Sequence, residues 1–133
     1  MEGPEFIVPP GYGERQRNLA HYSQAVKIGN RVETAGQGGW NDAFEFPETL
    51  REEIVQAFDN VERVLKSAGA SWGDVISLNS YHVPLDKKGE HLMVEQMRLR
   101  MPSHHPIFTC IGVAQLAEPQ MHVEIRATAI IGH

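Results

Sequence analysis

The sequence predicts an α+β fold in which one mixed sheet of about six strands carries two helices on a single face. Segments with a period of two and segments with a helical period follow one another in the order two strands, helix, strand, helix, two strands. Both helical segments have an apolar side that must be buried, and a sheet offers the surface to cover it. The length of 133 residues suits a single domain.

Residues 1–20 show no apolar period and hold three prolines and three glycines, so we predict an irregular arm there and one domain over residues 21–133. The first two predicted strands are Tyr22 to Ile28 and Arg31 to Thr34. The pair Gly29-Asn30 between them tolerates the left-handed backbone of a tight turn. The segment "GQGGWND" that follows then bends the chain, because its glycines lack side chains.

The first helix is predicted over residues 50–68. Its N-terminus carries the capping-box residues Thr49 and Glu52, and Gly69 ends it. A strand over residues 75–83 follows, because the sequence alternates and is rich in β-branched and aromatic residues. The helical spacing that identifies the first helix is carried by Leu50, Ile54, Phe58, Val61, Leu65 and Ala68.

The second helix is predicted over residues 88–101, with a methionine-rich side that defines its buried face less sharply. Two further strands come from "PIFTCIGVAQL" at 106–116 and "MHVEIRATAII" at 121–131. Side chains alternate between the two faces of a strand, so the last segment divides into an apolar and a polar row. The apolar row is Met121, Val123, Ile125, Ala127 and Ala129, and the polar row is His122, Glu124, Arg126 and Thr128.

Charge and composition limit the kinds of binding partner and the cellular location that the sequence predicts. Seventeen acidic residues against 12 Lys and Arg give a formal charge of -5, which makes nucleic acid an unlikely partner for want of clustered cations. One cysteine cannot form an internal disulfide, and no apolar run is long enough for a signal or a membrane span, so we expect a reducing, cytoplasmic location. The pair His104-His105 has no further ligand at zinc spacing, and we expect neither a metal nor a cofactor.

Several blocks taken together resemble the Rid family, also called YjgF or the L-PSP endoribonuclease family. They are "YSQAVKIGN", "GQ" at 36–37, "NVERVLKSAGASWGDV", "TCIGVAQL" and "VEIRATAI". The resemblance implies the chorismate-mutase-like sandwich and a homotrimer with a small-molecule cleft between adjacent subunits. The residues that it places around this cleft are Tyr22, Gly36, Gln37, Phe108, Cys110 and Glu124.

The best-studied branch of that family hydrolyses enamines and imines such as 2-aminoacrylate. In it an arginine two residues before the cysteine grips the substrate carboxylate, since a guanidinium matches a carboxylate with two charge-assisted hydrogen bonds. Here Phe108 stands two residues before Cys110. Phenylalanine donates no hydrogen bond and carries no charge, so the cleft is expected to favour neutral or aromatic ligands.

Glu124 matches the family glutamate that positions the hydrolytic water, although a glutamate on the polar side of a strand is more often a solvated charge. Tyr22 either stacks on a ligand or packs in the core. Arg126 stands where the family commonly has an acidic residue. It either forms an ion pair with Glu124 or a neighbouring subunit, or replaces the missing arginine. Cys110 is interpreted as an inert buried side chain, not a nucleophile.

Two functions from different classes remain open. The first is an enzyme that hydrolyses or tautomerises a neutral or aromatic imine or enamine, with Glu124 activating water. The second is a ligand-binding or regulatory protein without catalysis. Endoribonuclease activity ranks last, because the acidic charge disfavours RNA and no pair of histidines has the spacing of a general acid and base.

Overall fold

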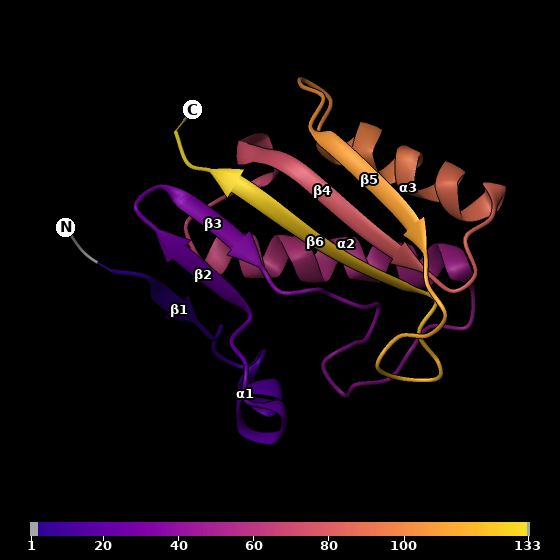
Figure 1. The fold of residues 1–133 in the computed structure, drawn as a ribbon, viewed down its shortest axis with the longest axis horizontal. Helices are drawn as coiled ribbons and strands as arrows, with labels where there is room; N and C mark the ends of the chain where they lie inside the picture. Colours follow the sequence, from indigo (N-terminus) through magenta and orange to yellow (C-terminus); the bar gives the residue numbers. More distant parts are fainter. Residues whose placement is uncertain (1–2, 133) are drawn as a thin grey trace.

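A computed structural model describes residues 3–132 and contains one mixed sheet with the strand order β1-β2-β3-β6-β4-β5 (Figure 1). Neighbouring strands are antiparallel except for β4 and β5. No helix among these residues is both long and apolar enough to cross a membrane. The elements are β1 (Glu5–Ile7), α1 (Glu14–Ala20), β2 (Ala25–Ile28), β3 (Arg31–Thr34), α2 (Leu50–Ser67), a 3-10 turn (Trp72–Asp74), β4 (Val75–His82), α3 (Lys87–Arg100), β5 (Ile107–Gly112) and β6 (Val123–Ile130).

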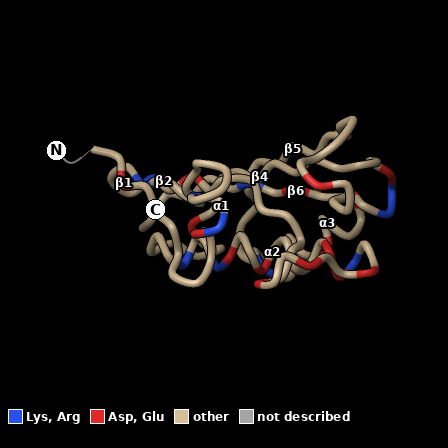
Figure 2. Tube along the Cα trace, turned by 90° about the horizontal axis from the view of Figure 1, so that it is seen from below, with Lys and Arg blue, Asp and Glu red and all other residues tan. Residues whose placement is uncertain are grey.

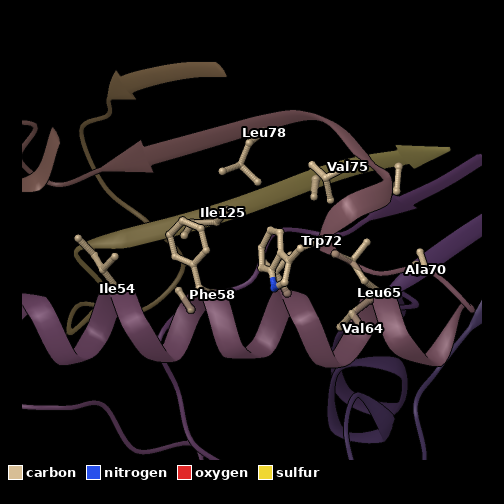
Figure 3. Close-up of a cluster of buried hydrophobic side chains, with 14 of the residues drawn as sticks. Ile54, Phe58, Val64, Leu65, Ala70, Trp72, Val75, Leu78 and Ile125 are labelled. Carbon is tan, nitrogen blue, oxygen red and sulfur yellow. The ribbon is translucent and has the colours of Figure 1, made fainter. Parts of the chain in front are cut away.

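The long helices α2 and α3 lie along one side of the sheet, which confirms the predicted arrangement, and the other side is uncovered by helices (Figure 2). The core between these two layers is built on α2, whose Ile54, Phe58 and Leu65 are fully buried against β4 and β6 (Figure 3). Phe58 packs on Trp72 with 5.5 Å between ring centroids. Burial of this apolar face stabilises α2 far more than helix propensity alone does.

The ends of α2 follow the predicted signals with one difference. The hydroxyl of Thr49 accepts a hydrogen bond from the backbone N–H of Glu52, and Gly69 follows the helix with a φ of +84°. The Glu52 carboxylate accepts a hydrogen bond from the Thr49 hydroxyl at 2.8 Å, whereas a capping box would direct it to the Thr49 backbone. Asp86 caps α3 in the same way, by accepting a hydrogen bond from the N–H of Gly89.

The expectation of an irregular arm over residues 1–20 is wrong. Residues Glu5–Ile7 form β1, a strand that the sequence did not predict and that pairs antiparallel with β2. Residues Glu14–Ala20 form α1. Neither element leaves an apolar period in the sequence, because β1 has three residues and α1 buries none of its side chains. They form through contacts with the rest of the chain, which a local pattern does not record.

A buried network docks this arm. The Trp40 indole N–H donates to the Tyr12 hydroxyl at 2.7 Å, and that hydroxyl donates to the Gln37 Oε1 at 2.5 Å. The Gln37 Nε2 donates in turn to the Gln24 Oε1 at 2.6 Å. Tyr12 is 5% exposed, and burial raises the pKa of its hydroxyl, which therefore stays protonated and able to donate. The network joins the arm, β2 and the glycine loop.

The register of the strands decides which side chains meet. Leu78 of β4 lies opposite both Phe108 of β5 and Ala127 of β6, so these three side chains share the helix-covered face. Side chains one position away point to the uncovered face, which is where Glu124 and Arg126 lie. The predicted division of the last strand into a buried apolar row and a half-buried polar row is confirmed.

Replacing Tyr12 by phenylalanine removes the central hydroxyl of the buried network. The Trp40 N–H and the Gln37 oxygen then lack a partner, and we expect a loss of about 1–3 kcal/mol in the free energy of unfolding. Urea denaturation measures it. The matched control is Tyr81→Phe, since the Tyr81 hydroxyl makes no hydrogen bond to residues 3–132. Equal effects of the two substitutions would contradict the structural role of the network.

Candidate functional site

Three of the predicted site residues, Tyr22, Gly36 and Glu124, line one hollow of about 270 Å³ beside the uncovered face of the sheet. We call it the Glu124 hollow. Three segments complete it: one side of α1, the glycine loop after β3 and the loop before β6. Their lining residues are Arg15, Gln16, Leu19 and Ala20 from α1, Trp40 and Phe44 from the glycine loop, and Ala117, Glu118 and Met121 from the last loop.

The backbone brings Gly36 directly against Glu124. Gln37 and Ile125 exchange two backbone hydrogen bonds, of 2.7 and 2.9 Å, which extend the pairing of β3 and β6 beyond the strand ends. A side chain at position 36 would then point at Glu124, and a Cβ placed on Gly36 would collide with the Glu124 carboxylate. Glycine is needed here because the carboxylate occupies the space of a side chain.

Glu124 has the properties of a proton-transfer group. Burial raises the pKa of its carboxyl group, because the charged form loses part of its hydration. None of the residues 3–132 donates a hydrogen bond to the carboxylate. Burial also raises the pKa of the Tyr22 hydroxyl, and the nearby Glu124 charge adds to this effect. Glu124 therefore has free lone pairs and a pKa shifted toward neutrality, as a general acid or base requires.

A second carboxylate fixes the start of β6. Both oxygens of Glu53, on the first turn of α2, are bonded to His122. One accepts the His122 backbone N–H at 2.7 Å, and the other lies 2.8 Å from its ring Nδ1. The Glu53 side chain is only 2% exposed, so these contacts are the compensation for its burial. His122 precedes Glu124 by two residues, and the clamp therefore holds the strand end from which Glu124 projects.

The far wall of the Glu124 hollow is aromatic. Trp40 stacks on Phe44 with 5.3 Å between centroids, and the Arg15 guanidinium lies 4.5 Å from the centre of the Phe44 ring. With Leu19 and Met121, these rings give the hollow an apolar wall, while two carboxyl groups, those of Glu118 and Glu124, also line it. The sequence analysis did not predict that Phe44 or α1 contributes to a site; the aromatic pair in "AFEF" was the available signal for Phe44.

Gln37 does not line this hollow, contrary to the prediction of a ligand contact. Its side chain is fully buried and bonded to Tyr12, Gln24 and the backbone oxygen of Ala35. Residue 37 is next to Gly36 in sequence, but alternation along an extended backbone turns its side chain to the opposite side. The role of Gln37 in this structure is to hold the loop that carries Gly36.

Phe108 and Cys110 also lie apart from Glu124 within one chain. Both side chains are on the helix-covered face, whereas Glu124 is on the other. Phe108 packs against the core and lines a groove of about 480 Å³ between β5 and α3, which we call the Phe108 groove. Cys110 is a half-buried free thiol. A single subunit therefore does not bring these two residues to the Glu124 hollow.

Arg126 does not pair with Glu124, so that part of the prediction is wrong. Its guanidinium lies 3.2 Å from a Glu33 oxygen, since Glu33 of β3 projects from the same sheet face one strand away. Arg126 also lines a second, larger hollow. Within residues 3–132, no group of three or more His, Cys, Asp or Glu side chains is placed to hold a metal ion.

Comparison with known proteins identifies the family of this chain and supports the fold. The sequence model of the family described as Endoribonuclease L-PSP matches residues 13–131. The chain therefore belongs to this family, to which the Rid and YjgF proteins also belong. It is 32% identical, over 85% of its length and 88% of the relative's, to a 2-iminobutanoate/2-iminopropanoate deaminase of Dermatophagoides farinae.

Two solved structures have a fold similar to that of this chain. RidA from the Antarctic bacterium Psychrobacter superposes with a TM-score of 0.76 at 30% identity, covering 85% of this chain and 90% of that one. Escherichia coli TdcF with bound serine superposes with a TM-score of 0.73 at 26% identity, covering 82% of this chain and 87% of that one. Members of the family thus include deaminases and at least one protein that binds a small amino acid.

The raised pKa of Glu124 predicts a pH-dependent effect of Glu124→Gln on stability. The folded state holds the proton more tightly than the unfolded state, so the wild-type carboxyl loses stability as the pH rises from the ordinary glutamate pKa through the raised value. We expect Glu124→Gln to raise the melting temperature above the wild type at about pH 8 and to change it little below about pH 4.

Thermal unfolding at both pH values, followed by circular dichroism, checks this expectation. The matched control is Glu48→Gln, because the exposed Glu48 stays hydrated in both states. A lower melting temperature for Glu124→Gln at the higher pH would show that the fold stabilises the charged carboxylate, which contradicts a pKa raised by burial.

Proposed function

We propose that the protein hydrolyses a small imine or enamine in the Glu124 hollow, with Glu124 as the proton-transfer group. The observation that carries the proposal is a carboxyl group with a raised pKa, free of hydrogen-bond donors from residues 3–132, at the wall of an apolar hollow. A carboxyl group whose pKa is raised is a stronger base when ionised than an ordinary glutamate, and it keeps its proton to higher pH for use as an acid. The deaminase relative supports this reaction class by its name.

The chemistry needs one water molecule and four proton transfers, each to or from Glu124. The Glu124 carboxylate removes a proton from water as the oxygen attacks the C=N carbon of a protonated imine, and a carbinolamine forms. The protonated Glu124 then returns the proton to the nitrogen, the C–N bond breaks as the hydroxyl oxygen forms the C=O bond, and the Glu124 carboxylate takes the hydroxyl proton. The carbonyl compound leaves, and ammonia takes this proton and leaves as ammonium, which restores the Glu124 carboxylate. An enamine enters the same path once Glu124 in its acid form has protonated its β-carbon. No cofactor takes part in these steps.

The aromatic lining supports a substrate with a large apolar or aromatic group. Trp40, Phe44 and Leu19 surround the space next to Glu124, and burial of an apolar group there contributes roughly 25 cal/mol per Å². The sequence resemblance puts Phe108 at the position of the family's carboxylate-binding arginine, which supports a substrate other than the small anionic 2-aminoacrylate. We therefore propose a deaminase-like hydrolase that differs in substrate from the enzymes acting on 2-aminoacrylate.

We further propose that the protein is a homotrimer whose clefts are completed by a neighbouring subunit. Phe108 faces away from Glu124 within one chain, so only a second copy can bring a Phe108 ring to this site. The edge strand β5 supports association, because Ile107 and Ile111 are 74% and 42% exposed and its outer hydrogen-bonding groups are unpaired. A reducing compartment such as the cytoplasm suits the single free thiol of Cys110.

Light scattering coupled to size exclusion tests the assembly. We expect a mass of three chains of 14.9 kDa. Ile107→Glu places a charge on the edge strand β5. Assembly would remove this charge from water without a partner, so we expect the variant to stay dissociated. Glu48→Gln serves as the surface control. A stable monomer at micromolar concentration would remove the proposal of clefts between subunits.

Imine hydrolysis is tested with imines generated in the assay from phenylalanine and from alanine, and with 2-aminoacrylate. We expect acceleration of the aromatic imine over buffer and a loss of about a hundredfold or more in Glu124→Gln. Phe108→Arg is expected to gain activity on 2-aminoacrylate, since the guanidinium restores a carboxylate partner.

The outcomes separate the open functions. If Glu124→Gln hydrolyses the aromatic imine as fast as the wild type, the assignment of Glu124 is wrong. If the wild type accelerates none of these imines yet binds small aromatic acids, the alternative of a ligand-binding or regulatory protein replaces the enzyme. Acceleration of 2-aminoacrylate by the wild type alone would contradict the role assigned to Phe108.

A further inference from the structure

A second hollow adjoins the Glu124 hollow on the uncovered face of the sheet. It measures about 650 Å³ and shares Tyr22 with the first, so the two spaces meet at this ring. We call it the Arg126 groove. Its chemically distinctive lining residues are Phe6 of β1, Arg17 of α1, His21, Tyr22, Glu33 of β3 and Arg126 of β6.

The Arg126 groove carries more positive than negative charge. Glu33 is the only acidic residue along its walls, and this one carboxylate lies 3.2 Å from both Arg31 and Arg126. Arg31 does not line the groove, so among the lining residues the charges of Glu33 and Arg126 offset each other. Arg17 leaves one positive charge over, because within residues 3–132 its only side-chain hydrogen bond goes to the neutral Asn18. The chain as a whole has a formal charge of -5, so this local excess is distinctive.

The geometry lets one molecule reach both hollows. Glu124 and Arg126 are two residues apart on β6 and project from the same face, which separates their Cα atoms by roughly 6.6 Å. Helix α1 borders both spaces, with Leu19 in the Glu124 hollow and Arg17 in the Arg126 groove. A carboxylate bonded to Arg126 thus leaves the rest of a small ligand close to Glu124 and its apolar wall.

We propose that the two hollows form one bipartite site for an aromatic carboxylic acid, with its carboxylate at Arg126 and Arg17 and its ring against the stacked pair of Trp40 and Phe44. The inference rests on the proposed function, which it makes more specific: the substrate class becomes aromatic 2-imino acids. The cation that binds the carboxylate then comes from α1 and β6 of the same chain, whereas Phe108 supplies none. Charge-assisted hydrogen bonds from a guanidinium give the acid its advantage over a neutral analogue.

Trp40 reports binding directly, because it lines the Glu124 hollow. The sequence has two tryptophans, and Trp72→Phe leaves Trp40 as the single fluorophore. The probes are 3-phenylpropanoate, the neutral 3-phenylpropanamide and the ring-free propanoate. We expect 3-phenylpropanoate to quench Trp40 with a Kd at least about tenfold below those of the other two probes. Titration calorimetry of the wild-type protein repeats the comparison without the Trp72 substitution.

The double variant Arg17→Gln, Arg126→Gln is expected to bind the acid and the amide about equally. Arg51→Gln, which removes an exposed guanidinium on α2 that lines neither hollow nor the Phe108 groove, is the matched control and is expected to keep the preference. Equal binding of acid and amide by the wild type, an unchanged preference in the double variant, or no binding of any probe would overturn the proposal.

This test is separate from that of the proposed function. The probes contain no imine and are not hydrolysed, so the preference for the acid is measured whether or not Glu124 is catalytic. Conversely, loss of hydrolysis in Glu124→Gln together with equal binding of acid and amide would support the proposed reaction and reject the bipartite site.

Discussion

The geometry of the Glu124 hollow depends on one constraint, the close approach of the Glu124 carboxylate to the backbone of Gly36. The paired backbone of Gln37 and Ile125 sets that approach, and the glycine leaves room for the carboxylate. Burial there disfavours the charged carboxylate, and the rest of the fold offsets this cost. A half-buried carboxyl group with a raised pKa and no hydrogen bond to residues 3–132 supports the proposed catalytic role of Glu124.

The surrounding elements hold this arrangement in place. The Glu53 clamp on His122 fixes the start of β6, and the buried chain of Tyr12, Gln37 and Gln24 fixes the glycine loop and the arm. Both use fully or nearly fully buried polar groups that are costly to leave unpaired, so the site is held by interactions that tolerate little displacement. The Glu53 clamp and the buried Tyr12 network support one side of the Glu124 hollow. Helix α1, which buries no side chain, forms another wall.

The sequence predicted the layers of the fold well and the site only in part. The periods of α2 and β6 record burial on one face, so these elements and the uncovered row of Glu124 and Arg126 could be read from local pattern. The strand β1 and the helix α1 leave no such period, because contacts with distant residues create them. Family resemblance named Gln37 and Phe108, yet resemblance gives positions along the chain and not the direction of a side chain or the subunit that it serves.

The pKa of the Glu124 carboxyl group is the most direct test of the proposed chemistry. A carbon-13 NMR titration of side-chain carboxyl groups measures it, with the resonance assigned by its loss in Glu124→Gln. We predict a midpoint above about 4.3, the ordinary value for glutamate, because burial disfavours the charged form. A midpoint at or below that value would mean that the carboxylate is solvated or paired, and the proposed acid and base role would lose its physical basis.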